Sequence, residues 1–281
     1  MRISAHVLVK NEERYLWYAV NSVAKHMDKI MIWDTGSSDN TIAIIRELEK
    51  LYPKQIDFKQ VGEISIERFA DMRQKMIEET KADWMFVLDG DEVWWDDSVQ
   101  ELIDLIQVKG ESLDSIVTRY VNVIGDIYHF QEEIAGQYKI DGQKGHLTIR
   151  AMNTHIPGLH AANPHGRQAY FDKENVPVQN LNKARRRFQE KLGYMHFTHL
   201  IRSDTLADDL KVPKRDIKYK KELGTPFPLD YYYPEVFFRP KPKIVQSPWV
   251  TMDQSFRFKS QILTPLRKLK RRLVPNRKSG Y

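Results

Sequence analysis

The chain has 281 residues, 41% of them hydrophobic and 29% charged, with a formal net charge of +6, which indicates a folded protein with a substantial core. It contains no cysteine, which excludes disulfides and thiolate metal sites, so any metal must use oxygen or imidazole ligands. The apolar run at its start is too short for a signal peptide, and no stretch reaches the roughly 20 apolar residues of a membrane span, so we expect a cytoplasmic protein.

Strand and helix patterns alternate three times in the first third of the chain. Apolar, β-prone runs at Ile3–Val9, 29–33, 56–61 and 83–88 predict buried strands, and helical spacing of apolar residues follows each of the first three. This alternation predicts right-handed βαβ units, and therefore an α/β fold with a mostly parallel central sheet flanked by helices.

Local signals predict where two of the helices begin. Asn11 is expected to cap the first helix, and Ser98 with Glu101 predicts a capping box ahead of the helix that follows the fourth strand.

Beyond Leu113 the alternation fades. Two strands are predicted at 115–124 and 146–152, with a loop-rich insertion between them, and a third at 193–201 precedes a charged helical run at 203–223. We therefore expect one domain over 1–205, divided into halves 1–110 and 111–205, and a helical or irregular C-terminal extension over 206–281.

The extension carries most of the positive charge. From 239 to 281 there are twelve Lys and Arg against one acid, a net +11, which leaves −5 for the rest of the chain. Leu266, Leu269 and Leu273 share one helical face among these basic residues, which is typical of a segment that contacts an anionic membrane, with a solvated tail as the alternative. Because the charge is terminal and no recognition module accompanies it, no nucleic-acid partner is expected.

Acidic residues follow two of the predicted strands. Asp34 ends the second run, and Asp89-Gly90-Asp91 follows the fourth. Ligands bind beyond the carboxyl ends of parallel strands, so we expect these acids to line one crevice. Paired carboxylates suit Mg²⁺ or Mn²⁺ bound together with phosphate oxygens, and Gly90 would let a diphosphate approach. Alone, such a strand-end motif is moderately specific for a metal site, because it also occurs as a turn or a helix cap.

The turn at 34–41 allows two interpretations. In one, Ser38 or Asp39 caps the helix that begins near Asn40. In the other, the Asp34 carboxylate accepts hydrogen bonds from the ring N–H or the hydroxyls of a nucleoside.

Three segments carry a family resemblance: VKNE at 9–12, DTGSSDNT at 34–41 and WMFVLDGDE at 84–92. In order and spacing they resemble glycosyltransferase family two, of the GT-A fold, over about 3–110 and more weakly to about 205. The resemblance implies a GT-A-like, Rossmann-type sheet and transfer of a sugar from a nucleotide-diphosphate donor, a UDP-sugar being favoured. The acceptor would be a hydroxyl of a glycan, a lipid-linked sugar or a protein, with inversion at the sugar carbon and Mn²⁺ or Mg²⁺ as cofactor.

The resemblance also implies site residues. Asp34 would recognise the base, and Asp89 and Asp91 would hold the metal-bound diphosphate. Asp39 and Gly90 would belong to the same nucleotide-sugar site. Arg73 falls where such enzymes carry a donor-contacting arginine, with a solvated helix charge as its alternative.

The family commonly adds a histidine metal ligand from the far end of the domain. His196 and His199 are the candidates. Neighbouring side chains of a strand alternate between its faces, so at most one of the two points into the site. We favour His196, with His199 as the alternative ligand and a structural role open for either.

The acceptor side is less defined by sequence. An inverting transfer requires a carboxylate near the acceptor hydroxyl, for which Glu132 and Glu133 are candidates, although a solvated acidic pair is their simpler interpretation. His160 and His165 are candidates to line the acceptor side.

Two other functional classes remain. The run from Leu88 to Val93 also matches the Asp-x-Asp-x-Val signature of haloacid-dehalogenase-type phosphohydrolases, with Asp89 as nucleophile. That signature usually opens its domain, and it leaves the Asp34 turn without a role. The other class is a nucleotide- or carbohydrate-binding module without catalysis.

Overall fold

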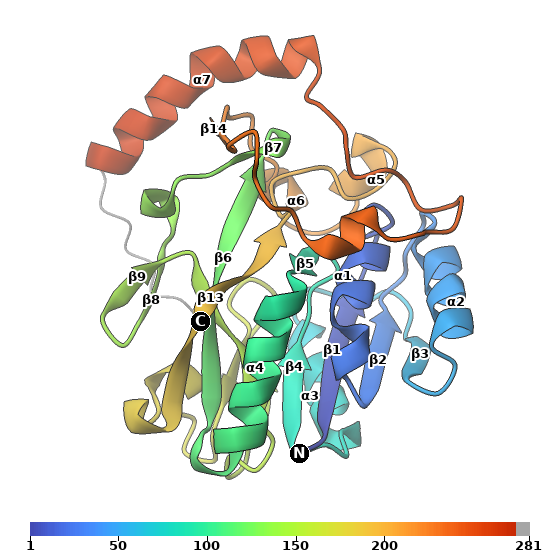
Figure 1. The fold of residues 1–281 in the computed structure, drawn as a ribbon, viewed down its shortest axis with the longest axis vertical. Coiled ribbons are helices and arrows are strands. Elements are labelled where there is room, and N and C mark those ends of the chain that lie inside the picture. The colour runs from blue at the N-terminus through green and yellow to red at the C-terminus, as the bar shows by residue number, and fades with distance from the viewer. Residues whose placement is uncertain (274–281) are drawn as a thin grey trace.

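The computed structural model describes residues 1–273, arranged around one large sheet (Figure 1). The strands in this part of the chain are β1 (Ile3–Val9), β2 (Lys29–Asp34), β3 (Ile56–Gln60), β4 (Trp84–Val87), β5 (Glu92–Trp94), β6 (Ser115–Ile124), β7 (Asp126–Phe130), β8 (Tyr138–Ile140), β9 (Gln143–Gly145), β10 (Leu147–Asn153), β11 (His160–Ala162), β12 (Ala169–Phe171), β13 (Arg186–His196) and β14 (Thr225–Pro226). The helices are α1 (Leu16–Val23), α2 (Thr41–Leu51), α3 (Phe69–Glu79), α4 (Asp96–Lys109), α5 (Leu206–Leu210), α6 (Arg215–Lys218) and α7 (Gln254–Leu273).

The sheet confirms the predicted α/β class. Its strand order is β14-β7-β6-β10-β4-β1-β2-β3, and β13 pairs with both β5 and β6. The strands of the first third are parallel: β1 lies between β2 and β4, and β3 adds to the outer edge of β2. The second half joins through antiparallel pairing, because β10 runs antiparallel to both β4 and β6.

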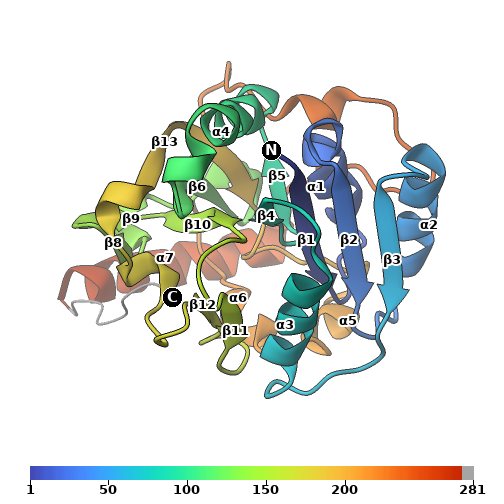
Figure 2. The ribbon, with the colours of Figure 1, turned by 90° about the horizontal axis from the view of Figure 1, so that it is seen from below.

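Helices cover both faces of the parallel strands (Figure 2). Alternate residues of β1, such as Ala5 and Val7, pack in one apolar cluster with α1, α2 and α4. On the opposite face Leu8 packs with Met72 and Met76 of α3. Strands β1, β2 and β4 are almost entirely buried and largely apolar, which is why they could be recognised in the sequence.

Two predictions for the region around β13 are wrong. The strand expected at 193–201 begins earlier, at Arg186, and ends at His196. The expected helical run at 203–223 contains only the short helices α5 and α6. The loop-rich insertion before β10 also holds β7 and the β8–β9 hairpin.

The two predicted helix starts are also wrong. Helix α1 begins at Leu16, and Asn11 lies upstream of it in a left-handed conformation with φ 54°. Helix α4 begins at Asp96, so Ser98 lies inside its first turn, where its hydroxyl donates to the carbonyl of Leu192 at 2.5 Å.

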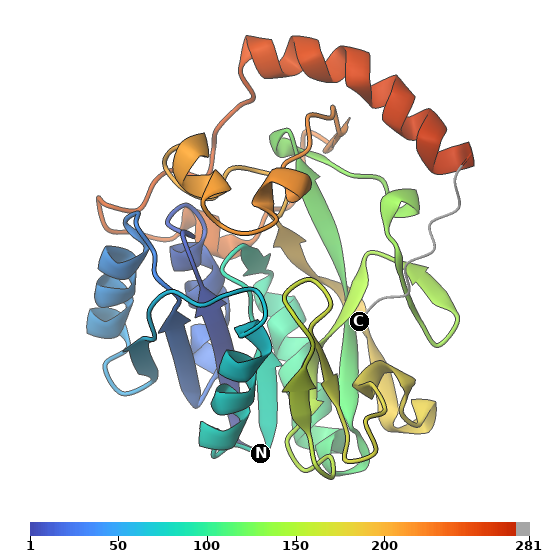
Figure 3. The same ribbon diagram turned by 180° about the vertical axis from the view of Figure 1, so that it is seen from behind.

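The C-terminal extension folds back over the first half before it forms α7 (Figures 1 and 3). The Tyr18 hydroxyl donates to the carbonyl of Gln246 at 2.7 Å, and the Trp95 indole donates to the carbonyl of Tyr232 at 3.0 Å. Residues 274–281 of the predicted basic tail lie outside the described residues. Among residues 1–273, no helix has the length and hydropathy needed to cross a membrane.

We expect Phe86→Ala to lower the free energy of unfolding by about 3–5 kcal/mol, since it removes a buried ring from a central strand. Phe86 is fully buried, and its ring lies 4.9 Å from that of Trp94. Urea denaturation measures the loss, with Val108→Ala on α4, at a position that is 78% exposed, as the control. A loss below about 1 kcal/mol would contradict a central position for β4.

Candidate functional site

The two acidic turns meet at the carboxyl ends of the parallel strands. Strand β1 pairs with β2 up to Val9 and Asp34, and with β4 up to His6 and Val87. The turns that follow β2 and β4 therefore lie on either side of the loop that follows β1. The two turns thus stand at the same end of the sheet, which is where the crevice is predicted.

Asp34 is almost completely buried, and only one of its two carboxylate oxygens accepts hydrogen bonds from residues 1–273. Its Oδ2 accepts hydrogen bonds from the backbone N–H groups of Gly36 and Ser37, at 3.0 and 3.1 Å. Its Oδ1 is buried and has no hydrogen-bond partner within the described residues. A buried acceptor without a partner is costly, so this oxygen is available to a ligand that brings its own donor.

Asp39 and Asn11 shape the same turn. Asp39 Oδ1 accepts from the N–H of Thr41, the first residue of α2, at 2.9 Å, in agreement with the helix-cap interpretation. Asn11 accepts from the N–H of Ser38 at 2.7 Å, and its own N–H donates to the Ser37 hydroxyl at 2.8 Å. The loop after β1 thus fixes the turn after β2.

Asp89 is held by two arginines from different elements. Arg73, on α3, donates to Oδ1 at 2.9 Å, and Arg150, on β10, donates to Oδ2 at 3.3 Å. Arg73 also binds the carbonyl of His6, and Arg150 also pairs with the buried Glu92. Burial alone would raise the pKa of Asp89, but Arg150 and Arg73 outweigh it and lower that pKa. Asp89 is therefore ionised, with a side chain that is one-third exposed.

Asp91 belongs to a buried charge cluster. Arg202 Nη1 lies 2.7 Å from Asp91 Oδ2 and 2.9 Å from Glu12 Oε1. Arg215 binds the same Glu12 oxygen and, at 2.7 Å, Asp209. Burial would raise the pKa of Asp91, but Arg202 and His196 hold it well below its usual range. Burial raises the pKa of Glu12, and the two guanidinium groups oppose that rise.

Gly90 is required by packing against the loop after β1. A Cβ at this position would lie 2.9 Å from Cγ of Glu12 and 3.2 Å from a methyl carbon of Val9. The structure thus gives a packing reason for Gly90 in addition to the approach of a diphosphate expected from sequence.

The two candidate histidines point in different directions. His196 Nε2 lies 3.5 Å from Asp91 Oδ2. His199 Nδ1 instead hydrogen-bonds the carbonyl of Lys218 at 2.8 Å, and its Nε2 lies 3.4 Å from the Lys220 ammonium. Of the pair, His196 is the one that shares the site with the Asp-x-Asp turn.

Asp91 and His196 fit two ligands of one divalent ion. Two atoms each about 2.1 Å from a metal span the 3.5 Å observed between Asp91 Oδ2 and His196 Nε2. Within residues 1–273, no group of three or more acids, histidines or cysteines is placed to hold a metal. Mg²⁺ is commonly bound by one or two carboxylates, with phosphate oxygens and water completing the shell, and Asp91 and the partly exposed Asp89 suit that arrangement. Arg202 shares the Asp91 carboxylate in this structure.

His165 and Lys218 line the same crevice. The His165 ring lies 4.6 Å from that of Phe69, at the start of α3. Burial, with the charges of Lys218 and Lys214, lowers the pKa of His165 to about 4. Lys218 is solvent-exposed, yet its pKa is lowered by partial burial of its ammonium group and by the charge of Arg202. The carboxylates of Asp91 and Asp89 oppose this lowering, so the ammonium group lies within electrostatic range of both.

The other acceptor-side candidates lie elsewhere. His160 Nδ1 bonds the carbonyl of Gly158, and its ring lies against Phe171, 5.7 Å between centroids. Glu133 accepts from Arg119 at 3.3 Å and from the N–H of His146 at 2.9 Å.

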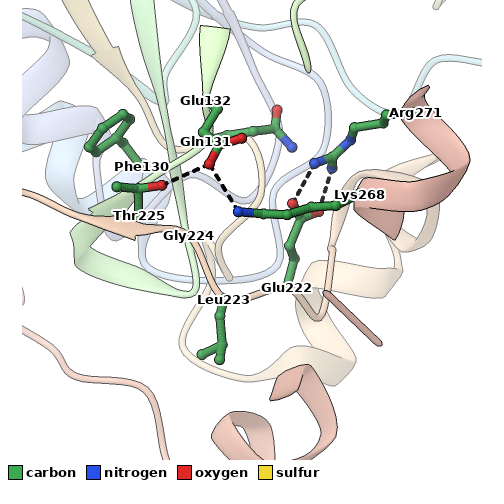
Figure 4. Close-up of a pocket in the computed structure, with 9 residues that line it drawn as sticks. All are labelled: Phe130, Gln131, Glu132, Glu222, Leu223, Gly224, Thr225, Lys268 and Arg271. Carbon is green, nitrogen blue, oxygen red and sulfur yellow. Dashed lines mark hydrogen bonds and ion pairs between the residues drawn. The ribbon is translucent and has the colours of Figure 1, made fainter. Parts of the chain in front are cut away.

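Glu132 is tied to the C-terminal helix. It pairs with Lys268 of α7 at 2.9 Å and accepts from the Thr225 hydroxyl at 3.3 Å (Figure 4). Its neighbour in this junction is the pair formed by Glu222 and Arg271. None of the described contacts joins Glu132 or Glu133 to Asp89 or Asp91.

Four residues of the site were not predicted from the sequence. Three are the arginines that pair with its acids, namely Arg150, Arg202 and Arg215, and the fourth is the acid Glu12. The segment at 9–12 was recognised as part of a motif, but nothing in the sequence linked Glu12 to arginines about 200 positions away.

Comparison with known proteins identifies a family. Residues 4–176 match the family described as Glycosyl transferase family 2. The SPbeta prophage-derived glycosyltransferase SunS of Bacillus subtilis is 24% identical over 146 residues, which cover 50% of this chain and 32% of SunS. The uncharacterized glycosyltransferase RC0292 of Rickettsia conorii is 32% identical over 91 residues, covering 32% of this chain and 29% of that protein. The chain thus spans about a third of the length of the curated relatives it matches.

Solved structures of glycosyltransferases align with parts of the chain at low identity. Residues 1–349 of Staphylococcus aureus TarS, in complex with UDP-GlcNAc, align with a TM-score of 0.47 at 16% identity, covering 70% of this chain and 58% of that one. The mannosyltransferase PcManGT of Pyrobaculum calidifontis, in complex with GDP-Man and Mn²⁺, aligns with a TM-score of 0.38 at 16% identity, covering 54% and 44%. The family match, by contrast, extends over more than half of the chain, and the chain therefore belongs to glycosyl transferase family 2.

Proposed function

We propose that this chain transfers a sugar from a nucleotide-diphosphate donor, a UDP-sugar by preference, to the hydroxyl of a glycan, a lipid-linked sugar or a protein. The observation that carries the proposal is the placement of Asp34, with its unpartnered buried oxygen, across the end of β1 from the Asp-x-Asp turn. One crevice then offers an acceptor for a base or ribose and an ionised pair for a metal-bound diphosphate.

Each group of the donor has a counterpart in the crevice. Asp34 Oδ1 would accept a donor N–H or hydroxyl, whereas Asp39 serves as the cap of α2. Arg73, Arg150 and Lys218 bring positive charge around Asp89 and would oppose the charge of the diphosphate.

Mn²⁺ or Mg²⁺ held by Asp91 and His196, with Asp89 nearby, would supply Lewis-acid stabilisation of the leaving diphosphate. Arg202 holds Asp91 in its ionised form, which is the form that binds a cation. The crevice positions the acceptor hydroxyl and limits access of water, because hydrolysis of the donor competes with transfer.

Inversion at the sugar carbon requires a base for the acceptor proton, and Glu132 and Glu133 remain the predicted candidates. Each is engaged in an ion pair, with Lys268 and Arg119 respectively. Either would have to release that partner before it could accept a proton.

Incubation with UDP-, GDP- and dTDP-sugars and Mn²⁺ tests the proposal. We expect slow, metal-dependent release of the nucleoside diphosphate, most rapid for a UDP-sugar, and loss of that release in Asp91→Asn. Binding without release would support a non-catalytic module. Turnover of an aryl phosphate without binding of any nucleotide sugar would support the phosphohydrolase alternative.

Asp34→Asn should weaken UDP binding about tenfold, the effect of losing one hydrogen bond of about 1–2 kcal/mol. Asparagine keeps an oxygen for the N–H groups of Gly36 and Ser37 and turns an amide toward the ligand instead of an acceptor. Calorimetry with UDP and Mn²⁺ measures the change.

The matched control is Asp39→Asn in the same turn. It should leave UDP affinity unchanged, because asparagine and aspartate cap helices about equally well. Equal losses in the two variants would contradict the role proposed for Asp34.

His196→Ala should weaken Mn²⁺ binding at least about tenfold in the presence of UDP, whereas His199→Ala should leave it unchanged. The reason is that His196 faces Asp91 while His199 bonds the backbone of Lys218. Mn²⁺ titration followed by electron paramagnetic resonance measures both variants. The reverse result would make His199 the ligand.

A further inference from the structure

Helix α7 exposes its apolar side to solvent. Phe258, Ile262, Leu266, Leu269 and Leu273 recur at intervals of three or four residues and so share one face of the helix. Their exposure lies between 54% and 70%. An ordinary surface helix buries such a stripe against its own core, so this face of α7 is open to a partner.

The opposite face of α7 is fastened to the body by polar contacts. Ser260 and Thr264 are buried, and the Thr264 hydroxyl accepts from the N–H of Leu223 at 2.8 Å. Lys268 pairs with Glu132 at 2.9 Å, and Arg271 pairs through both guanidinium nitrogens with Glu222 (Figure 4). These contacts fix which face points outward.

The charge of the helix identifies the partner. From 254 to 273 there are seven Lys and Arg and no acid. Lys259 and Lys270 are exposed, and at about 3.6 residues per turn they fall along one edge of the apolar stripe. A second copy of the chain would bring the same positive charge to the contact, which disfavours pairing of two α7 helices. An anionic lipid surface complements both the apolar stripe and the basic edge.

The position of α7 relates this surface to the crevice. In Figures 1 and 3 the helix arches over the end of the molecule that lies opposite the start of β1. The carboxyl ends of β1, β2 and β4, where the acidic turns stand, point toward that same end.

We propose that α7 lies in the interfacial plane of an anionic membrane, with Phe258, Ile262, Leu266, Leu269 and Leu273 in the acyl boundary and Lys259 and Lys270 at the headgroups. The crevice then faces the membrane, and the acceptor is a molecule carried on it. The proposed membrane contact depends only on the features of α7, whereas the class of acceptor rests on the proposed function.

Co-sedimentation of the full chain with vesicles tests the contact. We expect binding to phosphatidylcholine vesicles that contain phosphatidylglycerol, weaker binding as salt is raised, and little binding to phosphatidylcholine alone. Leu266→Asp should reduce binding at least about tenfold, because it places a charge in the acyl boundary. The matched control is Val108→Asp on α4, an exposed apolar position outside the stripe that should leave binding unchanged.

Three outcomes would overturn the proposal. They are absence of binding to the anionic vesicles, equal binding by Leu266→Asp and the unmodified chain, and a lipid-free dimer that Leu266→Asp dissociates. The last would make a second copy the occupant of the stripe. Donor hydrolysis without vesicles should be the same in both variants and the unmodified chain, so a failure of the proposed transfer activity is detected separately.

Discussion

A single buried carboxylate, that of Glu12, holds the functional end of the molecule together. It is 5% exposed and accepts hydrogen bonds from Arg202 and Arg215, which lie about 200 residues further along the chain. Arg202 also binds Asp91. The cluster therefore ties the loop after β1 to the turn after β4 and to the segment after β13. Loss of one member of such a buried cluster costs about 3–5 kcal/mol, since it leaves an uncompensated charge.

The ion pairs around Glu12 contrast with the apolar packing in the rest of the sheet. Below the crevice, the strands are held by apolar side chains on both faces, as around Phe86 and Trp84. Apolar side chains at the strand ends would exclude a charged ligand, and unpaired buried charges there would destabilise the fold. Pairing acids with arginines keeps these side chains ordered while the strand ends remain polar. The carboxylates proposed to bind the donor are therefore held in defined contacts, whereas Glu132 and Glu133 are held in contacts away from them.

The first four strands and the positions of Asp34 and Asp89 could be predicted because their signals are local. The strands that lead to these acids, β2 and β4, are short apolar runs, and each acid lies at or just beyond the end of its run. Strand β13 was misplaced because its first residues, from Arg186, are mostly polar and its position depends on pairing with β6. The expected helical run over 203–223 is broken because Pro213 follows α5 and Lys214 has a left-handed φ of 66°. Arg150 could not be predicted from local signals, since its partner Asp89 lies 61 positions away.

The pairing of Asp89 with Arg73 and Arg150 has an evolutionary consequence. Both arginines are buried, at 3% and 4% exposure, and Asp89 forms an ion pair with each of them. A descendant that lost this aspartate would forfeit stability as well as donor binding, because two interior cations would lose a counter-charge. Loss of Asp89 would therefore be selected against through reduced stability, unless both arginines were replaced at the same time. Selection for a stable chain thus helps to preserve the chemistry.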